Sequence, residues 1–130
     1  MCGSLPRAIM EILVADDEPA VAIAIKSALK FYGYTVLTVS NGDAALERVH
    51  AEPQRFYAVL SDHNMPGLGG LGLVKALRAA GYAGKVVILS AFLTPEVEAR
   101  YAELGVNQIL AKPFHIEKLR LALNPGPAAA

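Results

Sequence analysis

Five short apolar runs, separated by helical stretches, constrain the fold of this chain more than any other feature of its sequence. The runs cover residues 11–15, 34–39, 57–61, 85–89 and 106–111. Each has the length and the apolar or β-branched character of a buried strand. The segments between them carry apolar residues at helical spacing and are too long to be hairpin turns. This alternation predicts an α/β fold, a parallel sheet covered by helices on both faces.

Capping residues and glycines predict where the helices begin and end. Pro19 suits the first turn of the first helix, and Gly33 ends that helix. Residues 40–43, with the sequence SNGD, offer N-capping side chains to the second helix. Thr94 caps the fourth helix, and the last helix covers residues 115–123. We therefore expect five helices.

Length and composition predict one soluble domain. The chain has 130 residues, of which 54% are hydrophobic, enough for a real core. Its 12 basic and 12 acidic residues balance, so no broad basic face indicates nucleic-acid binding. The single cysteine, Cys2, excludes an internal disulfide, and no apolar run approaches membrane-spanning length. We expect a cytoplasmic domain over residues 9–123, a flexible leader over 1–8 and a disordered tail over 124–130, with no direct contact to nucleic acid or membrane.

Polar residues follow four of the five predicted strands. The first strand ends at Asp16 and Asp17, the third at Asp62, the fourth at Ser90 and the fifth at Lys112. In an open parallel sheet the carboxyl ends of all strands point to the same edge, where ligands bind. Chance explains one or two such residues at strand ends, but not this whole set. We therefore expect a functional site at this edge rather than a series of turn-capping residues.

The residue types of this set favour a metal ion and a phosphoryl group. Three clustered carboxylates repel one another unless a cation is present, and hard oxygen ligands suit Mg²⁺. The ammonium of Lys112 makes sense if an anion also binds, and the hydroxyl of Ser90 can donate a hydrogen bond to the same anion. Asp62 is a carboxylate that can accept a phosphoryl group covalently.

The ordered motifs resemble a response-regulator receiver domain, the phosphoacceptor module of two-component signalling, and are similar to its single-domain chemotaxis type. The matching motifs, in the order of the family, are Asp16-Asp17, Asp62 with Met65-Pro66-Gly67, Ser90-Ala91 and Lys112-Pro113-Phe114. They span nearly the whole chain, from about Glu11 to Leu123.

This resemblance implies a flavodoxin-like, doubly wound sheet of five strands in the order 2-1-3-4-5, with five helices. It implies that Asp62 takes a phosphoryl group from a phosphohistidine on a sensor histidine kinase or a histidine phosphotransfer protein. The chain is then a phosphoprotein of a phosphorelay and not a turnover enzyme. Its own chemistry is slow phosphotransfer to itself and slow hydrolysis of the aspartyl phosphate.

The resemblance also assigns roles to individual residues. Mg²⁺ is held by Asp16 (through water), Asp17, Asp62 and the backbone carbonyl of Asn64. The phosphoryl group is bound by Ser90, the backbone amide of Ala91 and Lys112. Ser90 swings toward the phosphoryl group when it arrives. The signal then leaves through the fourth helix, fifth strand and fifth helix, near Tyr101, Ile109 and Ile116.

Two positions depart from the pattern of the family. Receiver domains usually carry Tyr or Phe three residues before the lysine, as a switch that rotates on activation. Ile109 stands there in this chain, and it has no hydroxyl and a stiff side chain. Gly69 stands where the family often has an aspartate that caps the third helix, a change that should cost only a few tenths of a kcal/mol.

Two residues are predicted to set the lifetime of the aspartyl phosphate. Asn64 is polar and can orient the attacking water, whereas Phe92 excludes water if its ring leans over the site. Alternatively, the ring of Phe92 packs against the fourth helix and does not affect the site. The histidines, at positions 50, 63 and 115, have no metal-ligand spacing and are expected at the surface.

Three rival functions share parts of this pattern. A flavodoxin-like FMN protein would need a hydroxyl- and glycine-rich loop where the acidic residues 16–18 stand. An aspartyl phosphatase of the haloacid dehalogenase type would need Asp-x-Asp and a cap domain. A degenerate receiver would lack the acceptor, acids or lysine that are present here. No output domain is recognisable, so the chain acts through protein contacts or is part of a longer protein, and its target is not indicated.

Overall fold

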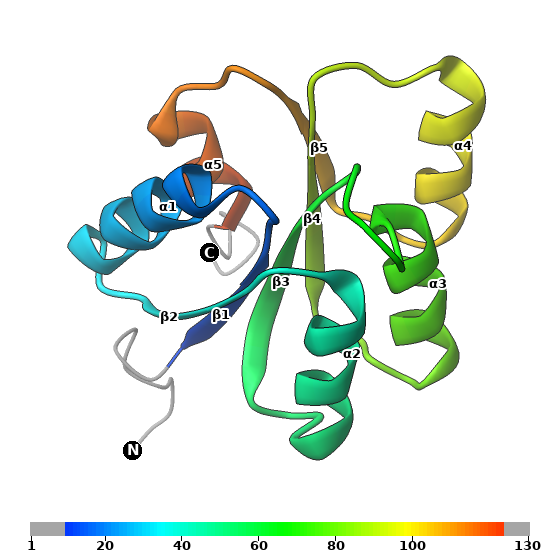
Figure 1. The fold of residues 1–130 in the computed structure, drawn as a ribbon, viewed down its shortest axis with the longest axis horizontal. Coiled ribbons are helices and arrows are strands. Elements are labelled where there is room, and N and C mark those ends of the chain that lie inside the picture. The colour runs from blue at the N-terminus through cyan, green and yellow to red at the C-terminus, as the bar shows by residue number, and fades with distance from the viewer. Residues whose placement is uncertain (1–9, 124–130) are drawn as a thin grey trace, which may run out of the picture.

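A five-stranded parallel sheet forms the centre of the computed structural model, which describes residues 10–123 (Figure 1). The strands are β1 (Glu11–Ala15), β2 (Thr35–Val39), β3 (Phe56–Asp62), β4 (Lys85–Ser90) and β5 (Gln108–Ala111). The helices are α1 (Pro19–Phe31), α2 (Gly42–Ala51), α3 (Gly70–Ala79), α4 (Pro95–Glu103) and α5 (Ile116–Leu123). The strand order is β2-β1-β3-β4-β5, with every neighbouring pair parallel, so the predicted fold class and order are confirmed. The predicted leader and tail lie outside the described residues.

The strands carry apolar side chains on both faces and so divide the core into two layers. In β1, Ile12 and Val14 pack with α1 and α5, whereas Leu13 and Ala15 pack with the helices of the other face. This alternation follows from the two-residue period of a strand. Helices α1 and α5 therefore cover one face of the sheet, and α2, α3 and α4 cover the other (Figure 1).

The capping residues predicted for the helices lie where the sequence placed them. Asn41 accepts a hydrogen bond from the backbone N–H of Ala44 at 2.7 Å, at the start of α2. Thr94 accepts one from the N–H of the residue three positions later, at the start of α4. Gly33 has a φ of 96° after α1, a left-handed conformation that favours glycine. Gly69 is the N-cap of α3, without a side-chain capping bond.

Five strand boundaries differ from the prediction by one or two residues, among them the end of β3 and the start of β5. β3 extends through Asp62, which pairs with Leu89 of β4. β5 begins at Gln108 instead of Val106, because the side chain of Asn107 accepts the backbone N–H of Val86 and takes the place of a ladder bond there. The first of these differences fixes Asp62 in the sheet itself.

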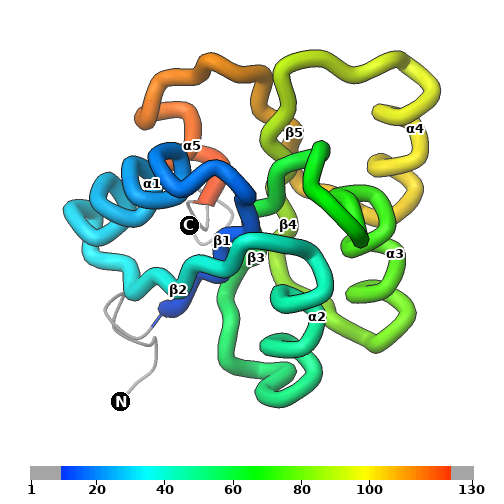
Figure 2. Tube along the Cα trace, viewed as in Figure 1, coloured from blue at the N-terminus to red at the C-terminus, as the bar shows by residue number. Residues whose placement is uncertain are grey.

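The loops that follow β1, β3, β4 and β5 gather at the same edge of the sheet (Figure 2). This convergence is the geometric consequence of parallel strands. Among residues 10–123, no helix combines the length and apolar character that a membrane crossing requires.

Candidate functional site

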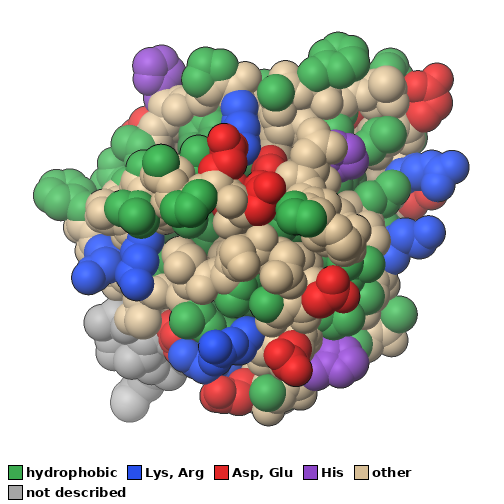
Figure 3. Space-filling view, viewed as in Figure 1, with side chains coloured by type: hydrophobic (Ala, Val, Ile, Leu, Met, Phe, Trp, Pro, Cys, Tyr) green, Lys and Arg blue, Asp and Glu red, His purple; other side chains and the backbone are tan. Residues whose placement is uncertain are grey.

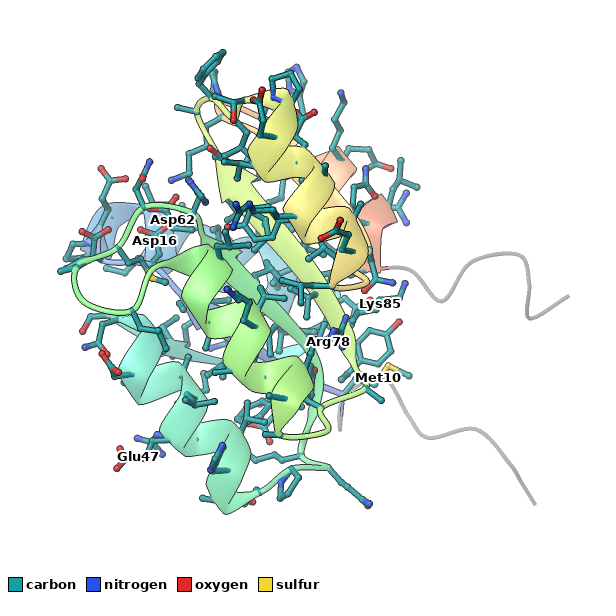
Figure 4. All side chains as sticks on the ribbon, turned by 90° about the vertical axis from the view of Figure 1, so that its right-hand side faces the viewer. Met10, Asp16, Glu47, Asp62, Arg78 and Lys85 are labelled. Atoms are coloured by element: carbon teal, nitrogen blue, oxygen red, sulfur yellow. The ribbon has the colours of Figure 1, made fainter. Side chains whose placement is uncertain are left out.

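The register of the sheet brings the acidic residues together. Ala15 of β1 pairs with Ser61 of β3, so Asp16 and Asp62 follow side by side. Figure 4 labels these two aspartates next to each other at one end of the sheet, far from Arg78. One carboxylate oxygen from each of Asp16, Asp17 and Asp62 lies within 4.8 Å of the other two. The predicted acidic cluster therefore forms.

Lys112 brings a positive charge to this cluster from the far side of β4. Ser90 pairs with Ala111, and the backbone N–H of Lys112 donates to the carbonyl of Ser90 at 2.7 Å. The Lys112 Nζ atom lies 3.0 Å from Asp62 Oδ1 and 3.7 Å from Asp16 Oδ2. Acidic side chains beside a basic one are visible on the face shown in Figure 3. The site thus holds more negative than positive charge.

Burial makes this charge arrangement costly. Asp16 is 2% exposed, and desolvation raises the pKa of its carboxyl group; the charges of Asp62 and Asp17 act in the same direction. A hydrogen bond from the backbone of Glu18, at 2.9 Å, and the charge of Lys112 oppose this effect without cancelling it. Asp16 Oδ2 is buried and has no hydrogen-bond partner among the described residues. An unsatisfied carboxylate oxygen in an acidic cluster suits a divalent cation.

Lys112 is held in its charged form. Its burial would lower the pKa of the ammonium, but the hydrogen bond and the charge of Asp62, with Asp16 and Glu18, outweigh burial and raise that pKa. A positively charged donor beside Asp62 is a suitable partner for an anion such as a phosphoryl group. The donor set therefore fits both a hard cation and an anion.

Ser90 lies at the end of β4 with its hydroxyl already bonded to the next loop. Its Oγ donates to the carbonyl of Phe92 at 3.1 Å and accepts from the N–H of Phe92 at 3.2 Å. Ser90 is 2% exposed, whereas Ala91, which follows it, is exposed at the same edge. The hydroxyl therefore lies near the site and can reach a new partner if it gives up these local bonds.

Three further predicted residues differ in their exposure and surroundings. Asn64 is exposed and lines a surface pocket together with Asp17 and His63. Ile109 is half-buried on β5, where it packs against the core layer under α2, α3 and α4. Phe92 is 78% exposed, so its ring is not packed into the core, and its effect on the site stays a prediction.

Two expectations about surface residues are also wrong. Tyr101 was expected on the signalling face, but it is fully buried because it lies on the side of α4 that faces the sheet and α3. His63 was expected at the surface, but it is half-buried and shares a hydrogen bond of 2.6 Å with the hydroxyl of Tyr101. The histidines at positions 50 and 115 are exposed, as expected.

The sequence prediction did not assign a role to Glu18. Its backbone N–H donates a hydrogen bond to Asp16 Oδ1, and its Oε1 atom lies 3.8 Å from Lys112 Nζ. The adjacency of three acidic residues, 16–18, was a signal for this contact. Glu18 also precedes Pro19 as the N-cap of α1, without a side-chain capping bond.

Comparison with known proteins agrees with this arrangement. The family model described as the response regulator receiver domain matches residues 12–124. The chain is 32% identical over 117 residues to a probable chemotaxis protein CheY of Rhizobium etli, covering 88% of this chain and 89% of that protein. It is 36% identical over 114 residues to the sensory/regulatory protein RpfC of Xanthomonas campestris pv. campestris, covering 85% of this chain but 15% of RpfC.

Solved structures share the fold at similar levels of identity. The chemotaxis protein CheY4 of Vibrio cholerae superposes with a TM-score of 0.80 at 29% identity, covering 88% of this chain and 96% of that chain. A response regulator receiver domain protein from Clostridium thermocellum superposes with a TM-score of 0.83 at 27% identity, covering 88% and 91%.

Proposed function

Because this chain belongs to the response regulator receiver domain family, we propose that Asp62 accepts a phosphoryl group from a phosphohistidine donor. An oxygen of the Asp62 carboxylate attacks the phosphorus, the P–N bond of the phosphohistidine breaks, and the imidazole leaves with the electron pair. The product is an aspartyl phosphate, and the chain relays its presence as a change of conformation. The chain acts as a phosphoacceptor, with slow hydrolysis of its own aspartyl phosphate.

One observation carries this proposal: Asp62 Oδ1 lies 3.0 Å from the Nζ atom of Lys112, in a cluster with Asp16 and Asp17. A nucleophilic carboxylate beside a fixed ammonium can receive a group that is itself an anion. Lys112 then changes partner from the free carboxylate to the phosphoryl oxygens, so its positive charge stays compensated throughout.

Mg²⁺ is the proposed cofactor, held by Asp17, Asp62 and the backbone carbonyl of Asn64, with Asp16 acting through water. When bound, the ion neutralises the acidic cluster and the charge that develops on the transferred group. The buried Asp16 Oδ2 atom, which lacks a hydrogen-bond partner among the described residues, supports this assignment. Lys112 alone cannot balance three carboxylates.

Ser90 and Ala91 are proposed to hold the phosphoryl group from the β4 side, through the Ser90 hydroxyl and the Ala91 amide. The Ser90 hydroxyl would exchange its two bonds to Phe92 for a bond to a phosphoryl oxygen. This exchange moves the loop between β4 and α4. Because Ile109 replaces the usual Tyr or Phe on β5, it has no aromatic ring that could rotate with that movement.

The proposed partners are a sensor histidine kinase or a histidine phosphotransfer protein on the donor side and an unidentified protein target on the output side. The output face is α4, β5 and α5, where Ile109 and Ile116 are half-buried and Leu121 is 55% exposed. Part of this face is hollowed between β5 and α5, in a pocket that Ile109 and Leu121 both line.

Chemical labelling tests the acceptor. After incubation with acetyl phosphate and Mg²⁺, the intact mass of the protein should increase by one phosphoryl group, and Asp62→Ala should take up none. The matched control is Asp43→Ala, which removes an exposed aspartate at the start of α2 and should be labelled like the wild type. Equal labelling of Asp62→Ala and the wild type would refute the assignment.

A further inference from the structure

A partly buried polar contact joins α4 to the residue that follows Asp62. The hydroxyl of Tyr101, on α4, lies 2.6 Å from Nδ1 of His63, and the two rings meet edge to face with centroids 5.6 Å apart. Tyr101 is fully buried. Burial, together with the nearby charge of Asp62, raises the pKa of the Tyr101 hydroxyl, so the hydroxyl keeps its proton.

The hydroxyl is confined by backbone as well as by the ring of His63. A Cβ atom added to Gly70 would lie 2.8 Å from both the Tyr101 hydroxyl and the carbonyl of Asp62. The tyrosine thus reaches into a corner that only glycine leaves open. The backbone of His63 is itself fixed. Its N–H donates to the carbonyl of Leu89 at 2.9 Å, and its carbonyl accepts from the N–H of Gly70 at 2.9 Å. A movement of this backbone therefore displaces the Tyr101 side chain, and α4 with it.

We propose that Tyr101 and His63 form the polar aromatic link that couples the state of Asp62 to α4 in this chain. This inference rests on the proposed function, since it needs Asp62 to be phosphorylated. Tyr101 is a positioning residue that acts through His63 and does not touch the phosphoryl group.

The position of the link explains why Ile109 is tolerated on β5. The loop from Ser90 to Thr94 is one connection between the site and α4, and a loop alone transmits movement loosely. The Tyr101–His63 contact is a second connection, made by a rigid ring and a hydrogen bond between the residue that follows β3 and the last turn of α4. With two connections, α4 must follow when the end of β3 and the loop after β4 rearrange. Coupling to α4 then does not need an aromatic ring at position 109.

Amide chemical shifts of the whole chain test this link, with beryllofluoride and Mg²⁺ as the stable phosphoryl mimic. In Tyr101→Phe, which removes only the hydroxyl, the shift changes around Asp62 and Ser90 should persist. Those over residues 95–104 should fall to less than half of the wild-type values. His63→Ala should behave in the same way, and the double variant should lose no more than either single variant.

Two further variants separate coupling from stability. Tyr82→Phe removes another buried tyrosine hydroxyl, which donates to the carbonyl of Phe56 at 3.1 Å, and should leave the shift changes over α4 intact. His63→Asn, whose side-chain amide can replace Nδ1 in the hydrogen bond, should restore much of the coupling that His63→Ala loses.

Labelling by acetyl phosphate identifies which proposal has failed. Wild-type protein that takes no label would overturn the proposed function, and the link with it. Wild-type protein that is labelled, together with undiminished α4 shifts in Tyr101→Phe and His63→Ala, would overturn the link alone. If Tyr101→Phe does not fold, the half-buried His63 decides the question through His63→Ala and His63→Asn.

Discussion

Asp16 occupies a position that suits the proposed metal site and opposes folding. Its carboxylate is almost completely buried, it faces two other carboxylates, and one of its oxygens lacks a hydrogen-bond partner among the described residues. Desolvation is the largest influence on its pKa and raises it. Residues at binding sites commonly reduce the stability of a protein in this way.

Asp16→Asn should therefore stabilise the metal-free protein, by roughly 1 kcal/mol at neutral pH. The amide keeps the oxygen that accepts the N–H of Glu18 and removes the buried charge. The contact with Lys112, at 3.7 Å, is lost, but it is weaker than the desolvation it accompanies. Urea unfolding of both proteins without Mg²⁺ measures the difference, and an Asp16→Asn variant that is less stable than the wild type at pH 7 would contradict the prediction.

The pH dependence of this gain follows from the direction of the pKa shift. The folded-state pKa of Asp16 lies above its ordinary value of 3.8, so between these two values the folded protein binds more protons than the unfolded chain. The penalty of the buried charge is complete above the raised pKa and disappears below 3.8. The stability gain of Asp16→Asn should accordingly be largest at neutral pH and shrink as the pH falls toward 3.8.

Phe92 is predicted to control how long the aspartyl phosphate lasts. Its backbone N–H and carbonyl bond to the Ser90 hydroxyl, and its ring is 78% exposed, so the ring is not held in the core and can move. Phe92→Ala should shorten the lifetime several-fold, a change of roughly 1 kcal/mol in the barrier, because water reaches the phosphorus more easily. Decay of the intact-mass label measures the lifetime. A decay rate equal to that of the wild type would show that the ring does not shield the site.

At the scale of elements, Arg78 connects two loops by hydrogen bonds at the end of the sheet opposite the site (Figure 4). From α3 its guanidinium donates to four backbone carbonyls at 2.8–3.0 Å: those of Leu104, Tyr82, Gly84 and Gly105. It thereby joins the turn before β4 to the turn before β5. These carbonyls lie in turns and have no backbone partner in a strand or helix among the described residues, so the charged guanidinium supplies their hydrogen bonds.

Arg78→Met should cost about 2 kcal/mol of stability, because half-buried carbonyls lose a charged donor while the apolar stem is retained. The control Arg48→Met removes an exposed arginine from α2 and should change stability by less than 0.5 kcal/mol. Urea unfolding compares the two. Labelling of Asp62 should be unaffected in both variants, and a loss of labelling in Arg78→Met would contradict the separation of the two ends.

The elements also show how far the sequence alone predicts this structure. Short apolar runs and capping residues such as Asn41 and Thr94 are local signals, so the type of every element and its place along the chain were predictable. The parallel sheet then placed Asp16, Asp62 and Lys112 at the same edge. The contact of His63 with Tyr101 was not predictable, because the two residues are 38 positions apart and neither carries a local signal. Helical spacing alone also did not reveal that Tyr101 faces inward.

At the scale of the whole molecule, two apolar layers hold like charges together at one edge. The layer under α1 and α5 and the layer under α2, α3 and α4 fix the strands, so the backbone at the aspartates cannot shift to relieve their repulsion. The free energy of global folding therefore includes the cost of this cluster. Any cation that binds the folded cluster, and not the unfolded chain, should return stability to the whole domain.

Mg²⁺ should therefore raise the free energy of global unfolding of the wild type, by about 1.4 kcal/mol at a concentration ten times its dissociation constant. Asp17→Ala should lose this gain, whereas Asp16→Ala should keep part of it if Asp16 acts through water. Asp43→Ala, outside the cluster, should gain as much as the wild type. Urea unfolding is measured for each protein in MgCl₂ and in NaCl of equal ionic strength. The difference between the two unfolding free energies is the Mg²⁺ gain, and it does not depend on how the substitution changes stability without Mg²⁺. An equal gain in Asp17→Ala and the wild type would place the cation elsewhere on the molecule.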